Sequence, residues 1–503
     1  MSERGLQWLS AREIRNSLDS GVLSGTELIT TLLARIQELN IDGPAIRAVI
    51  ETNPDAPAIA ERLESALAGE DTGRPLRGVP VLLKDNIDTA DSMLTTAGSL
   101  ALIGSHPQRD AFVAQQLRKV GAIILGKANM SEWANFRSTH SSSGWSARGG
   151  QALNPYALDR SPCGSSSGSA SAVAAGLVPA AIGTETDGSI LCPAGMCGVV
   201  GIKPTVGLVS RSGVIPISSS QDTVGPIART VEDAAVVLGA ISGVDPLDPA
   251  TTVCAERGFS DYTQFLDSDG LRGARMGVPR EIFFGYSPQV DAIAEAAIST
   301  MGDAGAVIVD PANIPSAEAM KKSDAEMTVL LYEFKAGLNR YLQTRVGIGA
   351  RSLEDVIAFN SHNPETEMPY FGQEIMLMAQ EKGMLTDTEY TEARAECVRL
   401  ARDEGIDRVL KEYELDALIM PTTGPAFTID HINGDHFSGG SSGPAAVAGY
   451  PGITVPAGMV RGLPVGMTFV GPAFSEPVLL RLAFAFEQLT HAWRPPQFMA
   501  RNM

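Results

Sequence analysis

The spacing of apolar residues changes along the chain, from a helical period near the N-terminus to short continuous runs further on. Ser10 and Ser24 are each followed three positions later by glutamate, the pattern of a capping box, and the second serine opens the helical stretch TELITTLLARIQEL. The run GVPVLLK predicts a buried strand that ends at Lys84, and AIILGKAN predicts another after the helical stretch DAFVAQQLRKVG. This strand–helix–strand order predicts an α/β fold whose central sheet is covered on both faces.

Residues 138–226 are dense in glycine, serine and threonine, which is typical of loops that carry function on a rigid scaffold. Further on, TVEDAAVVLGAISG predicts a helix, and the segment from LRGARMGVPRE to GAVIVDPA predicts a second strand–helix–strand unit. Residues 316–415 have a helical pattern rich in methionine and glutamate, which suggests an insertion near a pocket. The strands LDALIMPTT, GITVPAG and LPVGMTFVGP precede a closing helix, for which Ser475 is the expected N-cap.

Composition and charge exclude several classes of function. The 503 residues are 44% hydrophobic, enough for a large core, and the net charge of −19 disfavours nucleic acid and anionic membranes as partners. The N-terminus shows no signal peptide, and no apolar run reaches membrane-spanning length. We therefore expect a cytoplasmic monomer or simple homo-oligomer, and a periplasmic or secreted protein only if a leader has been removed.

Cysteine and histidine give little sign of a metal site. The cysteines are odd in number and form no Cys-x-x-Cys pair, which predicts buried reduced thiols rather than disulfides or zinc ligands. His431 and His436 lie with Asp430 and Asp435 in one loop, where a solvated polar loop is favoured over a metal site. We expect neither a metal nor a cofactor. The cysteines are Cys163, Cys192, Cys197, Cys254 and Cys397.

The stretch CGSSSGSASAVAAGLVPAAIGTETDGSI, residues 163–190, contains six serines and no histidine. Such clusters of serine and glycine most often form turns or cap a helix. The letters GSSSG also match the nucleophile elbow G-x-S-x-G with Ser166 at its centre, but the preceding LDRSPCG is not typical of the strand that an elbow needs. A third interpretation is a serine nucleophile whose base is a neutral lysine, with a second serine passing the proton.

Three lysines follow apolar runs and are candidates for that base: Lys84, Lys127 and Lys203. Buried lysines are rare, so each is either a base in the protein interior or a residue at a strand end that faces solvent. The residues alone leave this choice open.

Ordered motifs across nearly the whole chain favour the third interpretation. They are GVPVLLKDNI, GAIILGKANMSEWA, CGSSSGSASAVAAG, GTETDGSI, GIKPT, SSQDTVGPIARTVED, GYPGITVPAG and GLPVGMTFVG. Together they resemble the amidase signature family, and SEWANFRS, SGWSARGGQ, SPCGSSSGSA and LLYEFKAGLNRYL resemble bacterial peptide amidases in particular. The resemblance implies the family fold, with a large mixed central β-sheet, in a single domain over 1–503. Within it we expect N-terminal helices (1–60), a signature core with the catalytic loops (61–240) and the helical insertion (316–415).

The resemblance also assigns catalytic roles. It makes Lys84, in LLKDN, the base, and Ser165 a bridging serine that follows a cis peptide bond. Ser189, in TDGS, becomes the nucleophile of an acyl-transfer reaction. Backbone N–H groups of the turn are expected to donate to the oxyanion, with positive φ tolerated at its glycine. The residues of that oxyanion hole are Thr186, Asp187 and Gly188.

Substrate contacts are expected from Ala134, Asn135 and Ser166. Many relatives read T-D-x-G-G-S-I-R, whereas this chain has Glu185 in place of the first acid and Leu191 in place of the arginine. The lost arginine removes an anchor for a substrate carboxylate and favours a neutral end such as a carboxamide. The resemblance therefore implies release of ammonia from the C-terminal carboxamide of a small-molecule or short peptide amide. An aryl acylamidase that cleaves anilides, and an ammonia-transferring amidotransferase subunit, remain the alternatives.

Overall fold

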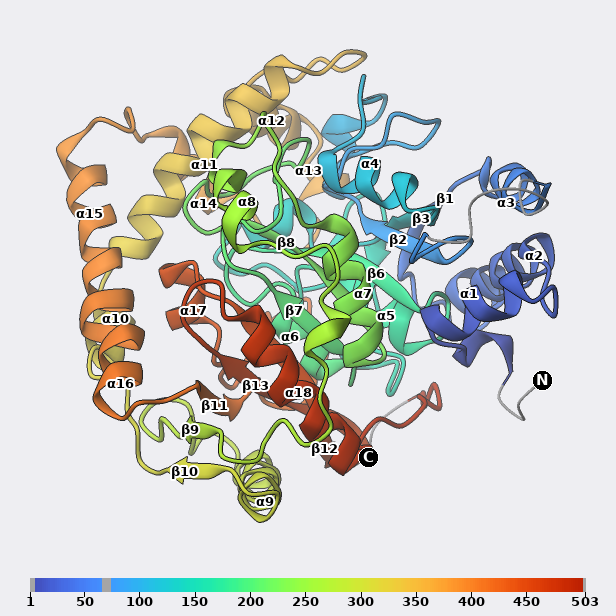
Figure 1. Ribbon diagram of the computed structural model, residues 1–503. Coiled ribbons are helices and arrows are strands. Elements are labelled where there is room, and N and C mark those ends of the chain that lie inside the picture. The colour runs from blue at the N-terminus through green and yellow to red at the C-terminus, as the bar shows by residue number, and fades with distance from the viewer. Residues whose placement is uncertain (1–4, 66–73, 501–503) are drawn as a thin grey trace.

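The computed structural model describes residues 5–65 and 74–500, so the predicted segments 1–60 and 61–240 lie partly outside the described residues. Within them, one eleven-stranded sheet runs through the molecule in the order β1-β3-β2-β6-β8-β7-β12-β13-β11-β9-β10 (Figure 1). Its strands are β1 (Val49–Thr52), β2 (Pro80–Lys84), β3 (Ile123–Ala128), β6 (Ala180–Glu185), β7 (Val200–Lys203), β8 (Thr223–Ala228), β9 (Arg275–Gly277), β10 (Val307–Val309), β11 (Ala417–Pro421), β12 (Gly452–Val460) and β13 (Leu463–Val470). A separate hairpin pairs β4 (Trp145–Ser146) with β5 (Gly150–Gln151).

The sheet is mixed, which confirms the predicted fold class. β2 pairs in parallel with β3 and β6, and β9 pairs in parallel with β10 and β11. Between these two parallel units, β6, β8, β7, β12, β13 and β11 pair antiparallel. β2, β3 and β6 are buried at every position, as expected for strands covered on both faces, so their sequences are continuous apolar runs rather than alternating patterns.

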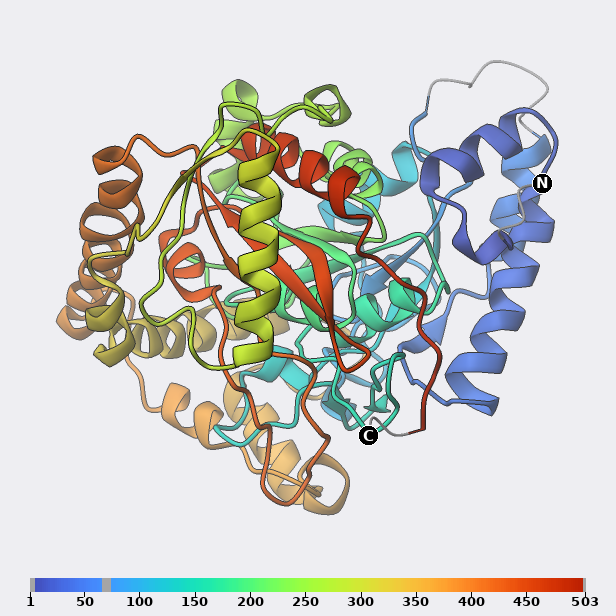
Figure 2. The same cartoon turned by 90° about the horizontal axis from the view of Figure 1, so that it is seen from below.

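Helices cover both faces of the sheet. One layer contains α4 (Phe112–Lys119), α7 (Val231–Ile241) and α18 (Glu476–Thr490), and α7 contacts both of the others. Figure 2 shows α9 (Pro288–Asp303) crossing in front of the strands near the C-terminus. α5 (Ser167–Ala174) packs on β6, and α6 (Leu191–Met196) packs on β13. Among the described residues, no helix has both the length and the apolar character that a membrane crossing would need.

The three N-terminal helices α1 (Ala11–Asp19), α2 (Gly25–Ile36) and α3 (Ala56–Ser65) lie near the β1 end of the sheet (Figure 1). At α1 the capping box is complete, because the Ser10 side chain accepts from the N–H of Glu13 while Glu13 accepts from Ser10. At α2 the Ser24 hydroxyl accepts from the N–H of Glu27. At α18, Ser475 is the N-cap residue, as predicted, but its side chain makes no capping hydrogen bond. Proline in the first turn removes a backbone donor that a cap would use.

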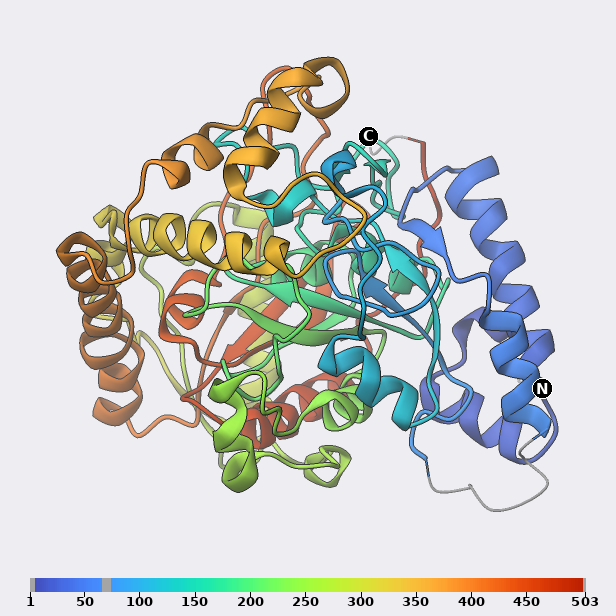
Figure 3. The same cartoon turned by 90° about the horizontal axis from the view of Figure 1, so that it is seen from above.

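The segment 317–412 is helical and lies at the opposite end of the molecule from the N-terminal helices (Figure 3). It packs on the loop that contains Phe136, whose ring meets that of Phe334 edge-on with 5.2 Å between centroids. The buried guanidinium of Arg137 pairs with Glu132 and donates to the carbonyl of Gly372 at 3.1 Å. The helices are α10 (Ala317–Lys322), α11 (Ala325–Gln343), α12 (Leu353–His362), α13 (Pro364–Glu367), α14 (Glu374–Gln380), α15 (Thr388–Val398) and α16 (Asp407–Glu412).

Candidate active site

All three candidate lysines are fully buried, with 0% of Lys84, Lys127 and Lys203 exposed. The alternative that they face solvent is therefore wrong for each. Lys127 donates to the carbonyl of Ile87 at 2.5 Å, and Lys203 donates to the carbonyl of Tyr450 at 2.6 Å. These hydrogen bonds anchor the ends of β3 and β7 to neighbouring loops. Because all three lysines are buried, burial alone does not identify a base.

Lys84 differs from the other two because it contacts a predicted catalytic serine. Its Nζ lies 2.8 Å from Ser165 Oγ, and the Gly164–Ser165 peptide bond is cis, as the resemblance implies. Lys84 Nζ also lies 2.8 Å from Thr184 Oγ1 and 3.0 Å from the Thr184 carbonyl oxygen. Asn86 donates to the same Thr184 hydroxyl at 3.0 Å. Thr184 therefore fixes the lysine in position at the end of β2.

The electrostatic surroundings favour the neutral form of this lysine. Burial lowers the pKa of Lys84 to about 7, although the carboxylates of Glu185 and Asp222 act in the opposite direction. An amine with this pKa is partly neutral at pH 7 and can accept a proton, whereas an ordinary lysine is almost wholly protonated there.

This pKa predicts the pH dependence of catalysis. Only neutral Lys84 can accept the proton of Ser165, so kcat/KM should be level above about pH 8 and fall about tenfold per pH unit below pH 7. Asp222→Asn removes a negative charge that raises the pKa of Lys84. The pH below which kcat/KM falls should therefore be lower in this variant. The measurement is kcat/KM for one amide substrate from pH 5 to pH 10 in both proteins. If kcat/KM falls at the same pH in Asp222→Asn as in the native protein, a group other than Lys84 controls the fall.

The predicted nucleophile Ser189 lies in the turn between β6 and α6 and is 7% exposed. The N–H of Ser166 donates to the carbonyl of Ser189 at 3.1 Å, so the loop that carries Ser165 lies directly against this turn. Gly188 has a φ of +76°, which favours glycine at this position. The fold thus brings together a lysine and two serines that are far apart in the sequence.

Glu185 organises the turn from within the protein. Its carboxylate accepts from the N–H groups of Gly188 at 2.9 Å, Ile190 at 2.7 Å and Leu191 at 2.9 Å. The N–H of Gly188 is therefore engaged, and its predicted place in the oxyanion hole is wrong in this structure. Glu185 therefore holds the backbone of the turn that carries Ser189 in place. The sequence analysis identified Glu185 only as a departure from the usual motif.

The other predicted oxyanion residues are Thr186 and Asp187. Thr186 is anchored by its hydroxyl, which donates to Asp222 Oδ1 at 2.6 Å. The Asp187 carboxylate is directed toward Gly443, where a Cβ atom would lie 3.8 Å from its Oδ2. Within residues 5–65 and 74–500, the N–H groups of Asp187 and Ser189 have no acceptor. These two amides are available to donate to a negatively charged oxygen.

Ser166 is not arranged as a nucleophile. It is fully buried, and its hydroxyl donates to the Thr184 carbonyl at 3.1 Å and accepts from the Thr184 N–H at 3.2 Å. The preceding residues form a loop rather than a strand. The nucleophile-elbow interpretation is therefore wrong, because the hydroxyl is used within the protein and no strand precedes it. The expected contact of Ser166 with substrate stays a prediction.

Ala134 and Asn135 lie on an unusual turn beside the cis peptide. Trp133, Ala134 and Asn135 have φ of +49°, +56° and +70°, a left-handed backbone that is rare outside glycine. Asn135 Nδ2 lies 3.1 Å from Ser143 Oγ and would lie 3.4 Å from a Cβ on Gly164. Asn135 Oδ1 is buried and has no partner among the described residues. It is an acceptor next to the catalytic loop that a ligand N–H could satisfy.

A disulfide joins the two loops that carry Ser165 and Ser189. Cys163 and Cys192, 29 residues apart, are bonded, so the prediction of reduced thiols is wrong for this pair. Cys163 precedes the Gly-Ser loop of Ser165, and Cys192 follows Ser189 by three positions. The covalent link therefore ties the loop of Ser165 to the turn of Ser189. The remaining cysteines are free and buried, namely Cys197, Cys254 and Cys397.

The histidine-containing loop makes contacts within the protein. The ring of His431 stacks on Tyr370 with 3.9 Å between centroids. Asp435 accepts from the N–H of Ser143 at 2.8 Å, and Asp430 accepts from the N–H of Asn433 at 2.9 Å. In the part of the chain that the structure describes, no group of three or more His, Cys, Asp and Glu side chains is placed to hold a metal ion.

Comparison with known proteins supports the assignment by resemblance. A family model described as Amidase matches residues 27–480. The chain belongs to the amidase family. This amidase is 44% identical to a probable amidase of Arabidopsis thaliana over 98% of its own length and 92% of that protein. It is 51% identical to the solved peptide amidase of Stenotrophomonas maltophilia, with a TM-score of 0.92 over 98% of this chain and 99% of that one. A glutamyl-tRNA(Gln) amidotransferase subunit of Carboxydothermus hydrogenoformans is 36% identical over 97% of this chain and 99% of its own.

Proposed function

We propose that this amidase hydrolyses the C-terminal carboxamide of short peptides, with release of ammonia, through Ser189, Ser165 and Lys84. The observation that carries this proposal is the 2.8 Å contact between Lys84 Nζ and Ser165 Oγ, together with a lysine pKa of about 7. A buried neutral amine beside a serine hydroxyl is a base positioned to activate a serine nucleophile.

The first half of the reaction is acylation. Lys84 takes the proton of Ser165, Ser165 takes the proton of Ser189, and Ser189 Oγ bonds to the carboxamide carbon. The N–H groups of Asp187 and Ser189 then donate to the resulting oxyanion, where one such donor contributes about 3–4 kcal/mol. When the carbon–nitrogen bond breaks, the protonated lysine returns its proton through Ser165 to the leaving nitrogen, and ammonia departs.

The second half is hydrolysis of the acyl-enzyme. Water attacks the ester carbon while its proton passes through Ser165 to Lys84. The same donors hold the second oxyanion, and the relay then protonates Ser189 as the ester bond breaks. The products are a peptide with a free carboxylic acid and the regenerated enzyme. The disulfide between Cys163 and Cys192 keeps the two serine loops in register throughout.

Three features favour a peptide carboxamide as the substrate. The solved peptide amidase of Stenotrophomonas maltophilia covers nearly the whole chain at 51% identity. Asn135 Oδ1 offers a buried acceptor for a peptide N–H next to the bridging serine. Leu191, in place of an arginine, leaves no cation there to hold a substrate carboxylate, and the nearby Asp187 repels one.

Two alternatives have weaker support. A solved bacterial aryl acylamidase is 24% identical, which shows a shared fold and nothing about substrate. The glutamyl-tRNA(Gln) amidotransferase relative is 36% identical over most of the chain, so family membership alone does not exclude a role with partner proteins. Against that role we weigh the acidic net charge of −19, which disfavours contact with tRNA.

The test is ammonia release from alanyl-leucine amide, measured beside nitroaniline release from an acyl nitroanilide with the same purified protein. We expect rapid ammonia release, a weak anilide signal, and no cleavage of the internal peptide bond by mass spectrometry. The Ser189→Ala protein is the blank for both assays. Anilide cleavage without ammonia release would contradict the proposal in favour of an aryl acylamidase. If neither ammonia nor nitroaniline is released, the proposal is contradicted, and a role in an amidotransferase becomes the favoured alternative.

A further inference from the structure

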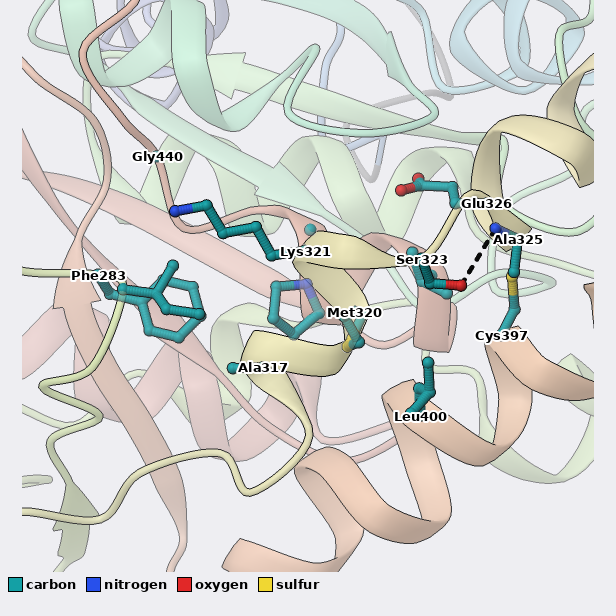
Figure 4. A pocket seen from close by; sticks show the side chains of 14 residues that line it. Phe283, Ala317, Met320, Lys321, Ser323, Ala325, Glu326, Cys397, Leu400 and Gly440 are labelled. Carbon is teal, nitrogen blue, oxygen red and sulfur yellow. Dashed lines mark hydrogen bonds between the residues drawn. The ribbon is translucent and has the colours of Figure 1, made fainter.

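A cavity of about 200 Å³ lies between the helical insertion, the loop at residues 282–283 and the segment 440–447 (Figure 4). Its walls are mostly apolar and come from four segments that are distant in the sequence. The side chains that define it include Phe283, Ala317, Met320, Cys397, Leu400 and Val447. Apolar walls of this kind bind an apolar group by removing its surface from water.

One wall of this cavity touches the catalytic turn. α17 (Gly443–Ala448) begins with Gly443 and Pro444, which both line the cavity. A Cβ on Gly443 would lie 3.8 Å from Asp187 Oδ2, and a Cβ on Gly188 would lie 2.9 Å from Ser442 Oγ. The cavity therefore starts one residue away from the turn that carries the nucleophile.

The opposite wall is tied to the same turn. Glu326, near the start of α11, lines the cavity, and its Oε1 accepts from Gln221 Nε2 at 2.9 Å. The same Gln221 amide lies 3.4 Å from the carbonyl oxygen of Thr186. Two segments, one at Gly443 and one at Glu326, thus hold the cavity against the turn. Neither contact involves Lys84 or Ser165.

A buried carboxyl group lies at the end of the cavity next to the turn. It belongs to Glu326, and Figure 4 shows the Lys321 ammonium directed toward Gly440 while Glu326 lies on the other side. Burial, and then the nearby Asp187 carboxylate, raise the pKa of Glu326 to about 8. Glu326 is therefore mostly protonated at pH 7, and the same burial and the same Asp187 carboxylate disfavour a negative charge on any group bound here.

We propose that this cavity binds the apolar side chain of the substrate's C-terminal residue, and that its buried apolar walls, with Asp187 beside its entrance, exclude acidic side chains. The inference rests on the proposed function. The leaving group of a carboxamide is ammonia, which needs no cavity of this size. The side chain of the C-terminal residue is attached one bond from the carbonyl carbon that Ser189 attacks. It is the substrate group closest to the turn and therefore the occupant that best fits the cavity.

The test compares kcat/KM for alanyl-leucine amide and alanyl-glycine amide. In Ala317→Phe, which fills the cavity, we expect kcat/KM for the leucine substrate to fall about tenfold or more while the glycine substrate changes less than about twofold. The control is Ala296→Phe, the same replacement at an exposed position of α9, which should change neither. Equal losses on both substrates, or no loss on either, would overturn the proposal. A loss confined to a nitroanilide substrate would instead place the leaving group in the cavity.

Two further variants keep the proposal testable if Ala317→Phe fails to fold. Met320→Ala enlarges the cavity and should shift preference from leucine toward tryptophan amides. Glu326→Gln keeps the acceptor for Gln221 but removes the group that ionises above about pH 8. The preference for a glutamine amide over a glutamate amide should therefore rise from pH 7 to pH 9 in the native protein and stay level in the variant. An unchanged preference in Met320→Ala, together with the same pH dependence in Glu326→Gln as in the native protein, would overturn the subsite. If the wild-type protein releases no ammonia even from the glycine substrate, the proposed function itself fails, which this design separates from failure of the subsite.

Discussion

Ser189→Ala should lower kcat for amide hydrolysis by about 10⁶-fold, the size of loss that follows removal of a serine hydrolase nucleophile. In the proposed mechanism the Ser189 oxygen bonds to the substrate carbon, so without it the enzyme can bind the amide but has no group to receive the acyl chain. The substitution removes one oxygen from a side chain that is 7% exposed, so the melting temperature should change little. The measurements are ammonia release under single-turnover conditions and thermal unfolding.

Ser171→Ala and Ser166→Ala are the comparison variants for Ser189→Ala. Ser171 lies in α5 and its hydroxyl donates to the carbonyl of Leu153 at 3.0 Å, away from the reacting groups. We expect Ser171→Ala to retain near-normal activity. Ser166→Ala loses the bond to Thr184 and should lose part of its activity, but not all of it. An inactive Ser166→Ala beside an active Ser189→Ala would make Ser166 the nucleophile and refute the proposed mechanism.

Lys84→Met should lower kcat by about 10⁴-fold, at the upper end of what one acid–base group contributes. Methionine fills a similar volume but cannot accept the proton of Ser165, which lies 2.8 Å from Nζ in the native protein. Because Ser165 then has no base, both acylation and deacylation should slow. The expected signature is a loss in kcat with a small change in KM, since the lysine lies behind the bridging serine.

Lys127→Met is a matched control, because Lys127 is also fully buried and on the neighbouring strand. Its Nζ donates to Ile87 and Thr95 rather than to a catalytic serine. Lys127→Met should destabilise the fold, since the nearby Asp85 and Asp88 lose a cation, while the folded fraction keeps its activity. Equal kcat losses per folded molecule in both variants would show that Lys84 acts through the fold and not as the base.

Local sequence determined much of the scaffold. The runs that end at Lys84 and near Ala128 became β2 and β3, because strands buried on both faces need continuous apolar side chains. The serine–glutamate pair at Ser10 became a capping box, because its partners are three residues apart on one turn of helix. The ordered motifs identified the family and, by resemblance, the serine and lysine residues that the fold then placed together.

Longer-range contacts decided what the sequence left open or predicted wrongly. Which buried lysine meets Ser165 depends on how the loop before α5 folds against the end of β2, since the sequence surroundings of Lys84, Lys127 and Lys203 are alike. Pairing of Cys163 with Cys192 carries no local signal, because the two become neighbours only when both catalytic loops fold.

The role of the Gly188 amide is hidden in the sequence for a related reason. The side chain of Glu185 turns back to bind it, a contact that depends on how β6 enters α6 and not on the motif itself. The apolar cavity beside the turn is likewise absent from any local pattern, since residues near Phe283, Ala317, Cys397 and Val447 form it together. The sequence by itself determined the buried strands, the first helix cap and the family, because those depend on neighbouring residues or on ordered motifs. The tertiary structure alone decided the contact between Lys84 and Ser165, the disulfide, the contacts of the Ser189 turn and the cavity, because each joins segments that the chain order keeps apart.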